Sequence, residues 1–120
     1  MTKTTIKRKL DKLFSEYIRS RGYCVKCRKT NYLQNAHIFS RSNLSVRWDL
    51  DNMLCLCPDC HINFAHKNPI LFTEFVREYL GAERYEQLKV RARAIKQWKL
   101  DEMVEFYESM KVALKERGLT

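Results

Sequence analysis

The chain has 120 residues, of which 45% are hydrophobic and 31% charged, and only three Gly and two Pro, so a low-complexity chain is excluded and one small folded domain is expected. No apolar run is long enough to span a membrane, and the charged N-terminus lacks the apolar segment of a signal peptide. The formal net charge of +9 favours a polyanionic partner, and the absence of targeting segments predicts a cytoplasmic protein.

The first predicted element is an amphipathic helix over residues 4–21, which Gly22 ends. Its apolar face is formed by Ile6, Leu10, Leu13, Phe14, Tyr17 and Ile18. Residues 23–56 have little helical periodicity and predict an irregular hairpin with two short strands. Another helix begins within Cys57-Pro58-Asp59-Cys60, because Pro is tolerated in the first helical turn and an acid is favourable there.

Three further helices are predicted, over residues 69–80, 82–96 and 98–116. We expect residues 1–68 to form the N-terminal helix and core. Residues 69–120 then form a helical extension packed on or beside that core, within a single compact domain. The predicted fold class is therefore small α+β, with a helical hairpin at the C-terminus.

Four of the five cysteines form two CxxC pairs, which are the four residues Cys24, Cys27, Cys57 and Cys60. Paired cysteines in a cytoplasmic chain bind metal more often than they form disulfides. Each CxxC turn supplies two thiolates, and two turns complete the tetrahedron of a structural zinc site. We expect a zinc ion that stabilises the fold and leaves no open position for hydrolysis. Cys55 lies outside this pattern and predicts a small buried side chain.

The positive charge is concentrated at the start of the chain. Residues 1–47 hold 12 Lys and Arg against 2 acids, a net of +10, whereas residues 48–120 hold 11 against 12, a net of −1. Phosphate contacts with DNA would use such a surface, and a merely solvated basic face is the alternative. Lys26, Arg41 and Arg47 are the predicted phosphate contacts.

A histidine, an asparagine and a second histidine lie between and just after the cysteine pairs. Ala36-His37-Ile38 is followed by Asn52, five residues before Cys57, and by His61, directly after Cys60. This order resembles an HNH (His-Me finger, ββα-metal) nuclease, in which a β-hairpin and a following helix hold one divalent ion. The resemblance implies that His37 is the general base, Asn52 fixes the hairpin loop and His61 binds a catalytic Mg²⁺ or Mn²⁺.

A second resemblance covers nearly the whole chain. Four segments resemble corresponding segments of the lambdoid-phage NinG/Rap recombination proteins. They are residues 10–19, Ser40-Arg41, Arg47-Trp48-Asp49 and residues 72–88. It implies a phage or prophage origin and cleavage of branched or recombining DNA. Junction resolution needs two active sites, so a homodimer is expected, with the predicted helix 98–116 as one candidate contact.

Two positions depart from these families. Many HNH nucleases carry an acid or His just before the base, where this chain has Ala36, so Asn35, Asp49 or Asp51 is the candidate substitute ligand. NinG-like proteins usually have Asn where this chain has His61, and an imidazole extends the usable ions towards Mn, Co, Ni or Zn. His66 follows His61 by five residues, which is not the α-helical spacing that places two ligands on one face.

Three functions are compatible with these patterns. The first is a metal-dependent HNH endonuclease acting on branched DNA. The second is an HNH endonuclease of restriction or homing type, acting on linear duplex. The third is a non-catalytic zinc-finger DNA-binding protein, in which His37 would serve structure alone.

Overall fold

The computed structural model describes residues 1–117. They form four α-helices, one π-helix, one short 3₁₀ helix and two strands. In chain order these are α1 (Lys3–Arg19), β1 (Gln34–His37), η1 (Leu50–Asn52), β2 (Met53–Leu56), η2 (Cys60–His66), α2 (Pro69–Leu80), α3 (Ala82–Arg93) and α4 (Leu100–Glu116). The two strands among these helices agree with the predicted small α+β fold. The last three residues of the predicted extension, 118–120, lie outside the described residues.

Helix α1 follows its predicted amphipathic pattern. Thr2 caps it, because the Thr5 backbone N–H donates to the Thr2 hydroxyl at 3.2 Å. Ile6, Leu10 and Phe14 recur at helical spacing and are buried. The helix ends at Arg19, and the chain turns away at Gly22, whose φ of +86° favours glycine.

The two strands form an antiparallel hairpin in which Ala36 pairs with Leu54 and His37 with Met53. Successive side chains of a strand point to opposite faces, so Asn35 and His37 lie on one face and Ala36 on the other. All four residues of β2 are buried. Helix α1 contacts both strands, and this hairpin therefore lies inside the molecule.

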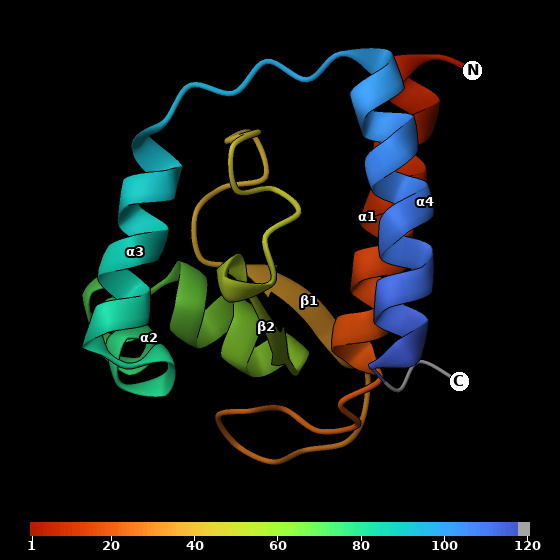
Figure 1. Ribbon diagram of the computed structural model, residues 1–120. Helices are drawn as coiled ribbons and strands as arrows, with labels where there is room; N and C mark the ends of the chain where they lie inside the picture. The colour runs from red at the N-terminus through yellow and green to blue at the C-terminus, as the bar shows by residue number, and fades with distance from the viewer. Residues whose placement is uncertain (118–120) are drawn as a thin grey trace.

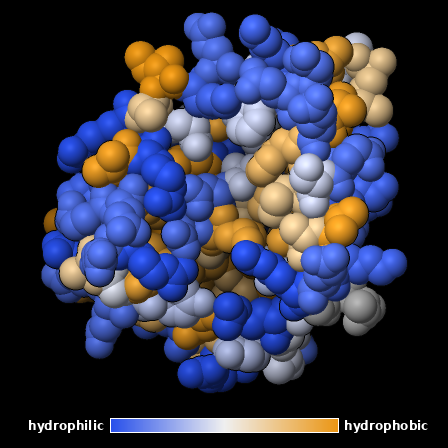
Figure 2. Space-filling view, viewed as in Figure 1, coloured by the Kyte–Doolittle hydropathy of each residue, from blue (hydrophilic) through white to orange (hydrophobic). Residues whose placement is uncertain are grey.

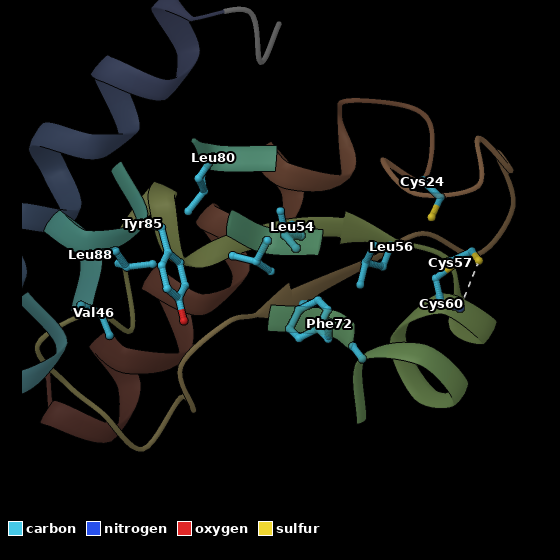
Figure 3. Close-up of a cluster of buried hydrophobic side chains, with 13 residues drawn as sticks. Cys24, Val46, Leu54, Leu56, Cys57, Cys60, Phe72, Leu80, Tyr85 and Leu88 are labelled. Atoms are coloured by element: carbon cyan, nitrogen blue, oxygen red, sulfur yellow. Dashed lines mark hydrogen bonds between the residues drawn. The ribbon is translucent and has the colours of Figure 1, made fainter. Parts of the chain in front are cut away.

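Two hydrophobic clusters lie on either side of the hairpin. The first joins the cysteine segments and the strands to α2 and α3, and Figure 3 shows Leu54, Leu56, Phe72, Leu80, Tyr85 and Leu88 of this cluster. The second joins α1 to α4 and includes Trp48 and Met53. Met53 belongs to one cluster and its neighbour Leu54 to the other, as the alternation of a strand requires.

The arrangement of the C-terminal helices corrects the sequence prediction. Helices α2 and α3 pack against each other, but α4 packs against α1 instead of completing a hairpin at the C-terminus. The third helix ends at Arg93, earlier than predicted, and an extended segment then crosses the molecule to α4. Figure 1 shows α1 and α4 side by side, running in the same direction. Trp98 anchors the crossing, because its indole N–H donates to the Leu44 carbonyl at 3.1 Å.

The apolar stripe of α4 is thus used within the chain. Met103 and Leu114 are fully buried against the α1 side, and the Phe106 ring stacks on Phe14 at a centroid distance of 6.0 Å. Figure 2 shows a hollow with apolar side chains at its floor, between the side of the molecule that carries α3 and the side that carries α1 and α4. Among the helices described over residues 1–117, none has the length and apolar character needed to cross a membrane.

Candidate active site and metal-binding cluster

The four cysteines of the CxxC pairs meet in one cluster. Their Sγ atoms all lie within 4.8 Å of one another, and those of Cys27 and Cys57 are 3.6 Å apart. Four thiolates around one zinc at about 2.3 Å would have sulfurs about 3.8 Å apart, so the donor set and its dimensions fit a tetrahedral ion such as zinc. Figure 3 shows Cys24, Cys57 and Cys60 together at one end of the first hydrophobic cluster.

Backbone hydrogen bonds build the first cysteine turn. The Cys24 N–H donates to the Lys29 carbonyl at 2.8 Å, and the Arg28 N–H donates to the Cys24 carbonyl at 2.9 Å. Arg28 adopts a positive φ of +72° to close this turn. The Val25 N–H donates to the Cys55 carbonyl at 2.9 Å, which holds the turn against β2. Cys55 itself is buried outside the four-sulfur cluster, as predicted.

The thiols of the cluster titrate differently. For Cys24, burial raises the pKa, but backbone hydrogen bonds from Cys27, Cys57 and Lys26 outweigh it and lower the pKa to about 7. For Cys60, burial and the neighbouring cysteines raise the pKa. Four thiolates in one place repel one another, and a divalent cation removes that cost by binding them all.

His37, the predicted base, ends strand β1 and is held in one tautomer. Its Nε2 lies 3.2 Å from the Arg47 carbonyl oxygen, which can only accept, so Nε2–H is the donor. The lone pair then lies on Nδ1. Burial is the main cause that lowers the His37 pKa below its ordinary value, and the charges of Arg41 and Arg47 add to it. The Arg47 carbonyl and Asp11 oppose this shift without cancelling it. His37 is therefore neutral at pH 7, as a general base must be.

Asn52 is fully buried and joins the two ends of the loop after β1. Its Oδ1 accepts from the Phe39 N–H at 2.7 Å, and its Nδ2 donates to the carbonyls of Phe39 and Val46, both at 3.0 Å. These three bonds use the amide as a bridge across the 39–46 loop. The loop leads directly to Arg47, whose carbonyl orients His37. Asn52 thus bridges the loop within the fold, and its role in the nuclease stays a prediction.

Replacing Asn52 with Ala is expected to lower the free energy of unfolding by about 2–4 kcal/mol, because it leaves backbone groups of the partly buried Phe39 and the buried Val46 without these partners. Chemical denaturation measures the change. The exposed Asn31 provides the control, since Asn31→Ala should change stability by less than about 0.5 kcal/mol. Equal stabilities of the two variants would show that the Asn52 bonds contribute nothing.

His61 faces the hairpin, as the sequence predicts. Its Nδ1 lies 2.7 Å from Gln34 Oε1, an acceptor, so Nδ1–H donates and Nε2 keeps its lone pair. Metal-binding histidines commonly donate their second ring N–H to an oxygen in this way. Gln34 is a residue that the sequence reasoning missed, because nothing in the local pattern indicates which side chain of β1 meets His61.

Residues 60–66 form a π-helix, which brings His66 back towards His61. The ring centroids of the two histidines lie 4.8 Å apart. Both side chains line a pocket of about 580 Å³, together with His37, Asn35 and Arg41. The structure thus gathers all three histidines of the chain around one pocket, between β1 and η2.

The three predicted phosphate contacts differ in the exposure of their side chains and in their partners. Arg41 is at the pocket, its side chain is 58% exposed, and it donates to Asp11 Oδ2 at 2.9 Å. Arg47 is only 16% exposed and donates to both Asp11 oxygens, at 3.1 and 2.7 Å. Its guanidinium therefore holds α1 against the loop, and Arg41 remains the better placed to meet a phosphate. The Lys26 Nζ lies 4.3 Å from the centroid of the Phe64 ring.

Asp11 is a second residue that the sequence reasoning did not identify. Besides both arginines, it accepts from the Trp48 indole N–H at 2.9 Å. Burial raises the Asp11 pKa, but the hydrogen bonds from Arg47 and Trp48 and the two positive charges outweigh it, so the pKa is lowered. The ionised carboxylate carries no free charge into the pocket because the arginines neutralise it.

The three candidate substitutes for an acid at position 36 lie in different parts of the structure. Asp49 and Asp51 form ion pairs with Arg91 and line a different cavity beside Trp98, so they lie away from His37. Asn35 lines the histidine pocket, and its buried Oδ1 has no hydrogen-bond partner among the described residues. Ala36 is buried in the first hydrophobic cluster. Of the three candidates, only Asn35 lies at the site, where its Oδ1 is an acceptor for water or a cation.

The comparisons with known proteins agree with this geometry. Residues 22–68 match a family model described as HNH endonuclease, so this part of the chain is similar to the HNH endonucleases. The matched segment contains the four-cysteine cluster and the three histidines of the pocket. Neither a curated protein nor a solved structure matches the chain.

Proposed function

We propose that the protein is a metal-dependent DNA endonuclease that hydrolyses phosphodiester bonds in the pocket between β1 and η2. The observation that carries the proposal is the complementary fixing of two histidines across this pocket. His37 keeps its Nδ1 lone pair because Nε2–H donates to Arg47, and His61 keeps its Nε2 lone pair because Nδ1–H donates to Gln34. One lone pair suits proton removal and the other suits metal binding.

In this proposal His37 Nδ1 takes a proton from the water that attacks the phosphorus atom. Burial keeps the imidazole neutral and ready for this step. His61 Nε2 would hold a divalent ion, Mg²⁺ or Mn²⁺ in the simplest case, and that ion would supply polarisation of the scissile phosphate and stabilisation of charge on the departing 3′ oxygen. The exposed guanidinium of Arg41 contacts a phosphate at the rim of the pocket.

Zinc in the four-cysteine cluster would support this site without taking part in the chemistry. Cys57 lies just before η2, Cys60 is its first residue, next to His61, and Cys24 lies in the turn tied to β2. A tetrahedral ion bound by four thiolates has no open position. Its contribution is to fix η2 against the hairpin, and hence His61 opposite His37.

The substrate that we propose is branched or recombining DNA in a phage-infected or lysogenic bacterial cell, on the basis of the NinG/Rap resemblance. A homodimer would supply the two active sites that junction resolution requires. Because Met103 and Leu114 of α4 are buried within the chain, the dimer contact would have to use residues outside that stripe, such as the exposed Val112.

Cleavage of a labelled four-way junction and a matched linear duplex tests the substrate. Zinc-loaded protein is incubated with each DNA in Mg²⁺ or Mn²⁺. Preferential cutting of the junction supports the branched-DNA proposal, whereas equal cutting of both supports the restriction or homing alternative. Binding to both DNAs without cutting in any divalent ion would leave a non-catalytic zinc-finger protein. Sedimentation with and without DNA tests the dimer.

A further inference from the structure

We infer that His66 is a second imidazole ligand of the ion bound at His61, and that this pair selects a transition-metal ion over Mg²⁺. The inference rests on the proposed function, since it concerns the same pocket. It identifies the ligand set and the metal class, neither of which follows from the match of residues 22–68.

The π-helix is the first argument. In an α-helix of 3.6 residues per turn, residues five apart differ by about 140° around the axis and face different sides. A π-helix closes i→i+5 hydrogen bonds and has roughly 4.4 residues per turn, so residues five apart differ by only about 50°. Residues 60–66 are such a helix, so His61 and His66 lie on one face. π-Helical turns are rare and are concentrated at functional sites.

The spacing of the rings is the second argument. Two imidazoles bound to one ion at about 2.1 Å have centroids roughly 3.2 Å from the ion, and hence about 4.5–5.2 Å apart for octahedral to tetrahedral angles. The centroids of His61 and His66 are 4.8 Å apart, within that range. His61 Nδ1 is already used by Gln34, so Nε2 is the nitrogen available to the ion. His66 is exposed, so its side chain can adjust without repacking the core.

The chemistry of the pocket is the third argument. Its lining, among the described residues, contains three histidines and Arg41 but no carboxylate. Mg²⁺ prefers carboxylate and water oxygens, and the nearby carboxylate of Asp11 is already engaged by Arg41 and Arg47. Imidazole ligands suit later first-row ions, whose affinities rise from Mn²⁺ through Co²⁺ to Ni²⁺. The pair should therefore bind Ni²⁺ and Co²⁺ more tightly than Mn²⁺, and Mg²⁺ most weakly.

Calorimetric titration of Ni²⁺ into protein already carrying one zinc in the cysteine cluster tests the inference. We expect wild-type protein to bind one Ni²⁺ at least about 100-fold more tightly than Mg²⁺. His66→Ala should weaken Ni²⁺ binding roughly 10–100-fold, and His61→Ala at least as much. Lys67→Ala is the matched control on the neighbouring exposed position and should bind Ni²⁺ as wild type does. Zinc content and thermal unfolding are measured for each variant, to show that the cluster and the fold are intact.

A second readout identifies the ligands directly. With Zn²⁺ as a diamagnetic second equivalent, ¹⁵N NMR of the histidine rings should show coordination shifts at both His61 and His66. A shift at His61 alone, with unchanged Ni²⁺ affinity in His66→Ala, would overturn the inference and leave the proposed nuclease standing. Wild-type protein that binds no ion beyond the zinc and cuts no DNA would overturn the inference and the proposed function together.

Discussion

Replacing His37 with Ala is expected to lower the rate of DNA cleavage by about 10²–10⁴-fold, the usual contribution of a general base. Folding and DNA affinity should stay close to wild type, because His37 is only partly buried and its side chain makes a single hydrogen bond among the described residues, to the Arg47 carbonyl. Single-turnover cleavage in saturating metal ion measures the loss, and a binding assay in a non-cleaving ion gives the affinity.

His37→Gln is the matched variant for this experiment. A glutamine amide can donate to the Arg47 carbonyl, as Nε2–H does, but it cannot accept a proton at neutral pH. Its cleavage rate should therefore be as low as that of His37→Ala while its stability is nearer to wild type. If His37→Gln cut DNA at the wild-type rate, the imidazole would have only a structural role.

The pH dependence of the wild-type rate follows from the environment of the same imidazole. His37 acts as a base only when neutral, so the rate falls as the pH drops through its pKa. Burial lowers that pKa below the ordinary value of 6.5. The acid limb of the pH–rate profile should accordingly lie below pH 6.5, and a limb well above that pH would indicate a different base.

Replacing Cys57 with Ser is expected to remove zinc and unfold the core around the hairpin. Binding of structural zinc in zinc-finger peptides contributes about 10–16 kcal/mol, which is as large as the whole stability of a typical domain, about 5–15 kcal/mol. Cys57 is buried, and its Sγ lies 3.6 Å from that of Cys27, so the cluster cannot close without it. Zinc content by elemental analysis and thermal unfolding by circular dichroism measure the effect.

Cys55→Ala separates metal binding from packing in this experiment. Cys55 is as buried as Cys57 but lies outside the four-sulfur cluster, so its loss should cost only about 1 kcal/mol and leave one zinc per chain. Full zinc occupancy and wild-type melting in Cys57→Ser would contradict a structural zinc site. Equal destabilisation of both variants would attribute the effect to packing.

The cysteine cluster could be predicted from the sequence because its signal is local. Each CxxC turn presents two sulfurs whatever the rest of the fold does, so only the meeting of the two turns had to be inferred. His37, Asn52 and His61 were identified through their spacing in the sequence relative to these turns. Their orientation at the pocket, by contrast, depends on Gln34 and Arg47, which are chemically ordinary residues whose partners only the folded chain reveals.

His66 shows where helical periodicity misleads. The prediction assumed 3.6 residues per turn and placed His66 on a different face from His61. In the π-helix the two rings lie next to each other, with centroids 4.8 Å apart. The partner of α4 was mispredicted for a different reason. An amphipathic stripe indicates that a helix is buried on one side but not against which element, and the crossing segment that carries α4 to α1 has no distinctive sequence signal.

The pairing of α1 with α4 also affects the order in which parts of the site can assemble during folding. Helix α1 completes its apolar contacts only when α4, some eighty residues later in the chain, is in place, and such distant contacts form slowly. Asp11 of α1 ties down Arg41 and Arg47, and Arg47 in turn orients His37. During synthesis the zinc-binding segment can therefore assemble early, while α1, which carries Asp11, completes its packing only after the last helix has docked. In the proposed nuclease, the cysteine cluster could thus bind zinc before the packing around Asp11 is complete.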